Sequence, residues 1–126
     1  MVRPTSKELT QRELEVMHVF WRTGDATAAE ARDSLAEKQI DLAYTTVATL
    51  VRILHEKGFL EAINDERPFR YRAARTYEEV SRRLLSDVVE RVFRGSREQL
   101  LVRLVEERKL SVKERTFLEQ ILKEQE

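Results

Sequence analysis

The feature that most constrains the fold is a scarcity of helix breakers combined with repeated helix-start signals. The 126 residues include only three Gly and two Pro, so most of the chain should be regular structure. In a capping box, a Ser or Thr and a Glu or Gln three residues later satisfy backbone N–H groups at the helix start. Five such pairs precede apolar residues at helical spacing: Thr10 with Glu13, Thr27 with Glu30, Thr76 with Glu79, Ser96 with Gln99, and Ser111 with Glu114. The sequence therefore predicts a mainly α-helical chain.

Six helices are expected, and one change of period interrupts them. The expected helices span about 10–22, 28–37, 43–57, 77–94, 97–108 and 112–124. Between the third and the fourth, residues 59–63 and 69–73 are predicted as short strands, and residues 64–68 as an exposed turn. Three helices followed by a two-stranded hairpin form a winged helix-turn-helix. We predict this DNA-binding domain over residues 1–75 and a helical dimerisation region of three helices over residues 76–126.

Composition excludes several classes of function. Acidic and basic side chains number 23 each, so the formal net charge is zero, which argues against indiscriminate coating of nucleic acid. The chain has no Cys and therefore no disulfide, thiolate metal cluster or Cys nucleophile. Its two imidazoles, His18 and His55, are expected on different helices, and neither a Gly-rich phosphate loop nor metal-ligand spacing is present. We therefore expect no enzyme, no cofactor and no metal site.

Membrane association is not expected either. No window approaches the ~18 apolar residues of a spanning helix, and the first eight residues have no apolar segment of a secretory signal. The polar faces of the C-terminal helices carry charges of both signs, which favours protein packing over membrane adsorption. A cytoplasmic location is the resulting expectation.

The helix expected at 43–57 has the surface that a DNA-reading helix needs. Its buried stripe is predicted to consist of Val47, Leu50, Val51 and Leu54. At 100° per residue, the opposite face carries small or hydroxyl-bearing side chains. These base-facing candidates are Thr45, Thr46, Ala48 and Thr49. Such side chains let a helix approach base edges, and threonine can hydrogen-bond a base or contact a thymine methyl. Tyr44 and Arg52 are better placed for phosphates. The alternative is an ordinary solvated helix face.

The predicted wing adds cations beside this helix. The candidate phosphate contacts are Arg67, Arg70 and Arg72, with Arg75 just beyond. Asp65 and Glu66 at the hairpin tip should repel phosphate, so we expect the arginines rather than the tip to reach DNA. A solvated strand face is again the alternative.

The C-terminal region carries more apolar side chains than three short helices can bury among themselves. The candidates for a dimer interface are Leu84, Val88, Val92, Phe93, Leu101, Leu104, Phe117, Leu118, Ile121 and Leu122. A two-fold interface with a second copy is the economical way to bury them. The alternative is that this region packs back on its own winged helix.

Segments along nearly the whole chain resemble the penicillinase-repressor family, of the BlaI/MecI type. Residues 9–17 with 19–21 resemble its first helix, 43–50 its recognition helix, 54–60 the exit into the wing and 69–72 the second wing strand. Residues 93–96, Phe-Arg-Gly-Ser, followed by Leu100 and Leu101, look like the F-x-G-S junction of its dimerisation domain.

The resemblance implies a homodimeric repressor of a palindromic operator with TACA/TGTA-like half-sites. In it, Thr45, Thr46 and Thr49 would face bases, while Tyr44, Arg52 and the wing arginines hold phosphates. The best-known members control β-lactam resistance genes, and a membrane sensor-protease pathway relieves repression by a cut before the Phe of the junction.

Two departures from the family pattern bear on regulation. The family is cut at an Asn-Phe bond, whereas the aligned bond here is Val92–Phe93, so cleavage would require a protease of different preference. A copper-responsive branch senses metal through a Cys-rich C-terminal site, which this Cys-free chain does not share.

Two other hypotheses remain open on the sequence. A winged helix can serve protein–protein assembly, and such a module needs neither small residues on its third helix nor arginines on its wing. A ligand-sensing regulator would bind an effector between wing and tail, for which the sequence shows no obvious pocket residues.

Overall fold

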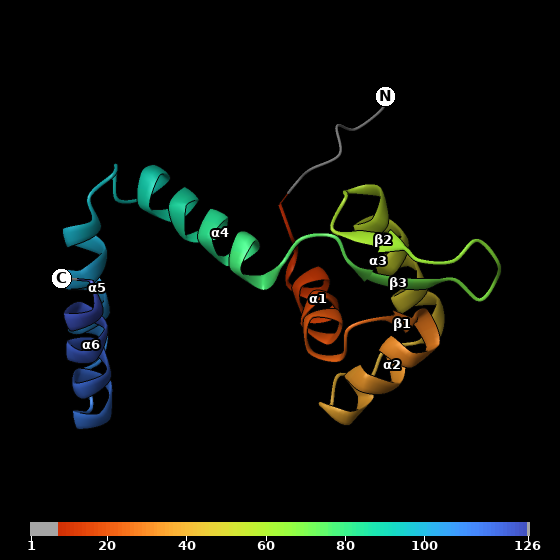
Figure 1. The fold of residues 1–126 in the computed structure, drawn as a ribbon, viewed down its shortest axis with the longest axis horizontal. Helices are drawn as coiled ribbons and strands as arrows, with labels where there is room; N and C mark the ends of the chain where they lie inside the picture. The colour runs from red at the N-terminus through yellow and green to blue at the C-terminus, as the bar shows by residue number, and fades with distance from the viewer. Residues whose placement is uncertain (1–7, 126) are drawn as a thin grey trace. The chain divides into compact units, whose positions relative to one another are not determined.

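The computed structural model describes residues 8–125, which form six helices and three short strands (Figure 1). In chain order these are α1 (Gln11–Thr23), β1 (Ala26–Thr27), α2 (Ala28–Glu37), α3 (Tyr44–Glu56), β2 (Leu60–Ala62), β3 (Arg70–Ala73), α4 (Tyr77–Arg91), α5 (Arg97–Glu107) and α6 (Val112–Glu124). The prediction of a mainly helical chain with a hairpin wing is confirmed.

The chain divides into two compact units, one up to Val80 and one from Ser81 onward. The first turn of α4 therefore belongs to the first unit, where Val80 joins the core. The functional boundary at residues 75–76 stays a prediction.

At all five expected helix starts, the Ser or Thr hydroxyl group forms the predicted capping hydrogen bond. The Ser or Thr oxygen accepts a hydrogen bond from the backbone N–H three residues later, at 3.0–3.2 Å. The reciprocal carboxylate bond is present at Thr10, Thr27 and Ser111. Gly24 ends α1 with a φ of 92°, a backbone conformation that residues with a Cβ rarely adopt. These helix starts were therefore readable from local sequence, whereas the helix expected to reach residue 94 ends at Arg91.

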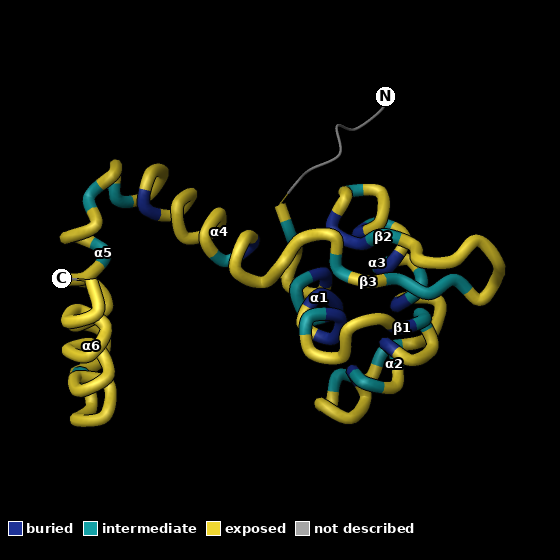
Figure 2. Tube along the Cα trace, viewed as in Figure 1, coloured by how far each residue is buried: buried dark blue, intermediate teal, exposed yellow. Residues whose placement is uncertain are grey.

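The core of the first unit lies among α1, α2 and α3 (Figure 2). Its largest fully buried side chains are Phe20, Met17, Leu35, Leu54, Leu60, Val16, Val19, Val47 and Val51. The predicted stripe of α3 is buried except for Leu50, which is half-buried. His18 is exposed and packs edge-on against Trp21. The buried side chains of this core hold α3 against α1 and α2.

The wing contains a strand that the sequence analysis missed. The sheet is antiparallel with the order β1-β3-β2. Ala26 pairs with Tyr71 and Thr27 with Arg70, while Leu60 pairs with Ala73 on the other edge. A two-residue strand is too short to show alternation, so no periodic signal predicts it. Its pairing joins the start of α2 to the wing.

The second unit is formed by α5, α6 and α4 beyond its first turn. Among its described residues, only Val89 is buried, and Figure 2 shows exposed positions along almost all of α5 and α6. Within residues 8–125, no helix is long and apolar enough to cross a bilayer.

Candidate nucleic-acid interface

The predicted base-facing residues share one exposed face of α3. Thr45, Thr46 and Thr49 are exposed, and Ala48 is half-buried beside them. The three threonines and Leu50 line a shallow depression of about 310 Å³. The Thr49 hydroxyl donates to the Thr45 carbonyl at 2.9 Å, which leaves its oxygen free to accept from a base and its methyl free for apolar contact. This face has the chemistry expected of a major-groove reader.

A groove of about 610 Å³ separates α3 from the wing. On the α3 side it is lined by Tyr44, Ala48, Val51 and Arg52, on the wing side by Arg67, Pro68, Phe69 and Tyr71, and at its end by Thr27, Ala28 and Ala29. Because Ala28 and Ala29 begin α2, their backbone N–H groups belong to the positive end of a helix dipole. Aromatic rings, two guanidinium groups and a helix start thus line one groove.

The predicted phosphate contacts are not equally available. Arg67 is exposed and lies over the Phe69 ring, 5.8 Å from its centroid, and no ion pair with a carboxylate is found for it among the described residues. Arg52 pairs with Glu56 one turn along α3 at 2.8 Å, and both side chains are more than half exposed. Such an exposed ion pair contributes little to the stability of the fold and opens readily. Arg52 can therefore turn to a phosphate.

The two arginines of β3 form ion pairs with carboxylates of the same chain. Arg72 pairs with Glu61, its neighbour across the β2–β3 register. Arg70 contacts both Asp25 and Glu30 at 2.9 Å. The acidic tip residues Asp65 and Glu66 are exposed, as expected. Phosphate contact by Arg70 and Arg72 stays a prediction, and each would compete with carboxylates of its own chain.

A buried ion pair anchors the C-terminal end of α3. The Lys57 ammonium donates to Glu13 Oε1 at 2.8 Å and Oε2 at 3.0 Å, and to the Glu8 carbonyl at 2.9 Å. Glu13 is 3% exposed and also completes the capping box of α1 with Thr10. Burial raises the pKa of Glu13, but the bonds from Lys57 and Thr10 outweigh it and hold that pKa below its ordinary value. From the sequence, Glu13 was predictable only as a helix cap.

The predicted dimer residues lie in the second unit and are mostly exposed. Leu84, Val88, Val92, Leu101, Leu104, Phe117, Leu118, Ile121 and Leu122 are all exposed, by 36–68%, whereas Phe93 is half-buried. Val92 and Phe93 lie between α4 and α5, and Val92 is 68% exposed. The Val92–Phe93 bond is thus outside both helices.

Comparison with known proteins fits this arrangement. The family model described as penicillinase repressor matches residues 9–124, which is almost all of the chain. The chain belongs to the penicillinase-repressor family. The methicillin resistance regulatory protein MecI of Staphylococcus aureus is 27% identical over 115 residues, covering 91% of this chain and 93% of MecI. The transcriptional regulator BlaI of Mycobacterium tuberculosis is 33% identical over 90 residues, covering 71% of this chain and 64% of BlaI.

The penicillinase-repressor family consists of transcriptional repressors, which indicates a general role in regulating transcription. The named relatives are regulators of transcription and of antibiotic resistance, and neither carries the name of an enzyme. Within residues 8–125, no three His, Cys, Asp or Glu side chains gather in a way that could hold a metal ion.

Proposed function

We propose that this penicillinase-repressor family member is a homodimeric repressor that binds a palindromic operator through α3 and the wing. The observation that carries the proposal is the exposed hydroxyl face of α3 beside the groove lined by Tyr44, Arg52 and Arg67. A helix with small side chains can enter the major groove, while a flanking wing meets the phosphates. Operator DNA lies in the cytoplasm, so the protein would act there.

The second half of the proposal is dimerisation through the second unit. Thirteen of its large apolar side chains are exposed, and large exposed apolar patches mark interaction sites. Two copies related by a two-fold axis would bury these side chains and present two copies of α3 to a two-fold operator. Linked half-sites raise the affinity by ~10²–10⁴ over a single one.

The proposed target genes and the proposed way in which repression is relieved are those of the family. The operator would contain TACA/TGTA-like half-sites and control β-lactam resistance genes. A sensor-protease pathway would relieve repression by cutting the dimerisation region. The exposed Val92–Phe93 bond is the proposed cleavage site, and its Val would require a protease of different preference.

Fluorescence anisotropy with a TACA/TGTA palindrome and a shuffled duplex, at two salt concentrations, tests DNA recognition. We expect the palindrome to bind about a thousandfold more tightly. Thr49→Glu should abolish this preference, because a carboxylate on the α3 face would meet base edges and phosphates. Glu119→Gln on α6 is a control in the second unit.

Equal, weak binding of both duplexes would contradict the proposed operator. Selection from a random duplex pool would then separate a different operator from no DNA role. If no sequence is enriched, the DNA proposal fails and a protein–protein assembly module becomes the better account.

A further inference from the structure

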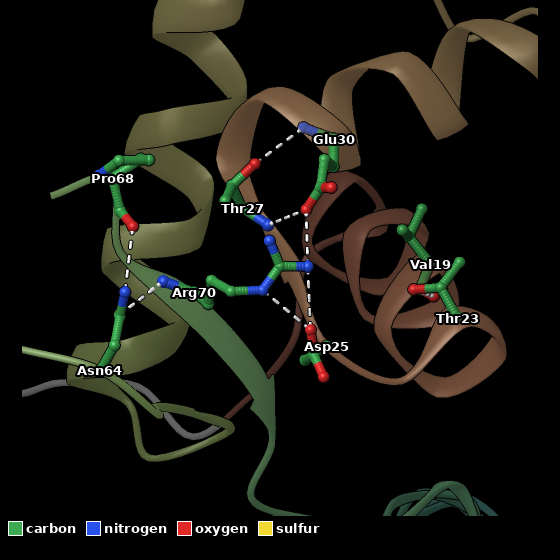
Figure 3. A network of polar contacts seen from close by, with 8 residues as sticks. All are labelled: Val19, Thr23, Asp25, Thr27, Glu30, Asn64, Pro68 and Arg70. Carbon is green, nitrogen blue, oxygen red and sulfur yellow. Dashed lines mark hydrogen bonds and ion pairs between the residues drawn. The ribbon is translucent and has the colours of Figure 1, made fainter.

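The base of the wing holds a polar network centred on Arg70 (Figure 3). Arg70 Nε donates to Asp25 Oδ1 at 2.9 Å. Its Nη2 lies 2.9 Å from the same oxygen and 2.9 Å from Glu30 Oε1. One guanidinium in β3 therefore bridges a carboxylate that precedes β1 and a carboxylate in the first turn of α2. A planar fork suits such a bridge better than a point charge does.

The same network fixes the start of α2. Glu30 Oε1 also accepts from the Thr27 N–H at 2.9 Å, and the Thr27 hydroxyl accepts from the Glu30 N–H at 3.1 Å. The Thr27 amide and Arg70 hold the pKa of Glu30 below its ordinary value. Glu30 is therefore ionised at neutral pH and serves both as a cap and as a partner of Arg70.

On its other side the network holds the wing loop. Asn64 Nδ2 donates to the Glu66 and Pro68 carbonyls at 3.1 and 3.2 Å, and its Oδ1 accepts from the Arg70 N–H at 2.8 Å. The Ile63 N–H donates to the Arg70 carbonyl at 2.9 Å. Arg70 is thus the residue at which the wing loop, β3 and the start of α2 are joined.

The charge of this cluster disfavours phosphate. One guanidinium and two carboxylates leave a net charge of −1, and like charges repel at short range. Arg67 is the opposite case, because it is exposed, lies over Phe69 and lines the groove with Arg52. The two wing arginines are therefore suited to different tasks.

We propose that Arg70 is a positioning residue, which with Asp25, Glu30 and Asn64 sets the wing against the start of α2, and that Arg67 is the wing residue that binds a DNA phosphate. This inference rests on the proposed DNA binding and specifies the work of each wing arginine. It departs from the simpler expectation that all wing arginines form one phosphate clamp.

Salt dependence of operator binding separates the two roles. On duplex DNA, log affinity falls linearly with log salt, and each lost phosphate contact lowers the magnitude of this negative slope, here called the salt slope, by about 0.9. We expect Arg67→Gln and Arg70→Gln each to weaken binding by about tenfold, the effect of one charge-assisted hydrogen bond. Only Arg67→Gln should lower the magnitude of the salt slope by about 0.9. A salt slope lowered in magnitude by Arg70→Gln and unchanged by Arg67→Gln would overturn the assignment.

A charge swap provides the rescue test. Arg70→Asp should weaken binding more than Arg70→Gln does, because it adds a third carboxylate to the cluster. Adding Asp25→Arg restores both the ion pair and the net charge of the chain, so most of the lost affinity should return. Failure to recover would show that Arg70 itself is needed at the DNA.

Amide hydrogen exchange, measured without DNA, tests the positioning role of Arg70 independently of the proposed DNA binding. Arg70→Gln should speed exchange of the Ile63 N–H, which is bonded to the Arg70 carbonyl, whereas Arg67→Gln should leave it unchanged. Equal exchange in Arg70→Gln and wild type would overturn the positioning role. If the wild-type protein selects no duplex, the proposed function and the role of Arg67 both fail, while exchange still decides the role of Arg70.

Discussion

The two units bury their apolar side chains to very different extents. In the described part of the first unit, three large hydrophobic side chains are exposed, namely Tyr44, Ile63 and Tyr77. In the described part of the second, thirteen are exposed, and only Val89 is buried. Burial of apolar area stabilises by roughly 25 cal/mol per Å². The first unit thus has a core of its own, whereas the described part of the second buries almost none of its large apolar side chains within one chain.

The contrast also indicates a different role for each unit of the proposed repressor. The first unit has a buried core against which α3 packs, and the threonine face of α3 is exposed. The second exposes large apolar side chains along α4, α5 and α6. We therefore attribute recognition to the first unit and pairing of two copies to the second.

The largest expected effect comes from a charge in the proposed interface. Leu118→Asp should dissociate the dimer, because each copy would bring a carboxylate into an apolar contact. Affinity for a palindromic operator should fall by ~10²–10⁴, while affinity for a single half-site is retained. Sedimentation equilibrium and anisotropy measure the two effects.

Gln120→Asp is the matched control for that variant. It adds the same charge two residues along α6, about 200° around the helix from Leu118. It should leave both the mass in solution and operator affinity unchanged. A Leu118→Asp protein that still sediments as a dimer would break the proposed contrast between the units.

The next effect concerns the first unit alone. Lys57→Met should lower its free energy of unfolding by about 3–5 kcal/mol, because it leaves the Glu13 carboxylate buried without its cation. Urea unfolding followed by fluorescence of Trp21, the single tryptophan, reports on this unit. Adding Glu13→Gln should recover most of the loss, since Gln also completes a capping box. An equally unstable double variant would contradict this explanation.

A smaller effect is expected from pH. Because Lys57 and Thr10 hold the pKa of Glu13 below its ordinary 4.5 despite burial, its ionised form stabilises the folded state. This contribution is present above about pH 4.5 and is lost as pH falls through the lowered folded-state pKa. The Trp21-detected unfolding free energy should therefore drop on acidification, and less so in Glu13→Gln. An identical pH profile for both proteins would remove Glu13 from this account.

Features encoded within a few residues were predictable from the sequence. The capping boxes at Thr10, Thr27 and Ser111 are local patterns, and so is the apolar stripe of α3, because their partners lie within one or two helical turns. The exposed position of Thr45 and Thr49 followed from the same helical period. These helix starts and the face of α3 were therefore accessible without a structure.

Features that join distant segments were not predictable in this way. Lys57 and Glu13 are 44 residues apart, and Arg70 and Asp25 are 45 residues apart, so no spacing rule relates them. β1 was missed for a related reason, since its two residues are defined only by pairing with β3. Arg70 consequently looked like Arg67 in the sequence, although the structure surrounds it with carboxylates.

The most direct test of the central claim is the number of chains on an operator. Native mass spectrometry of the full chain, free and with a palindromic duplex, counts them. The account predicts a free protein of twice the chain mass of 14.9 kDa and a complex of two chains with one duplex. A free monomer that binds the palindrome as one chain per duplex would contradict it.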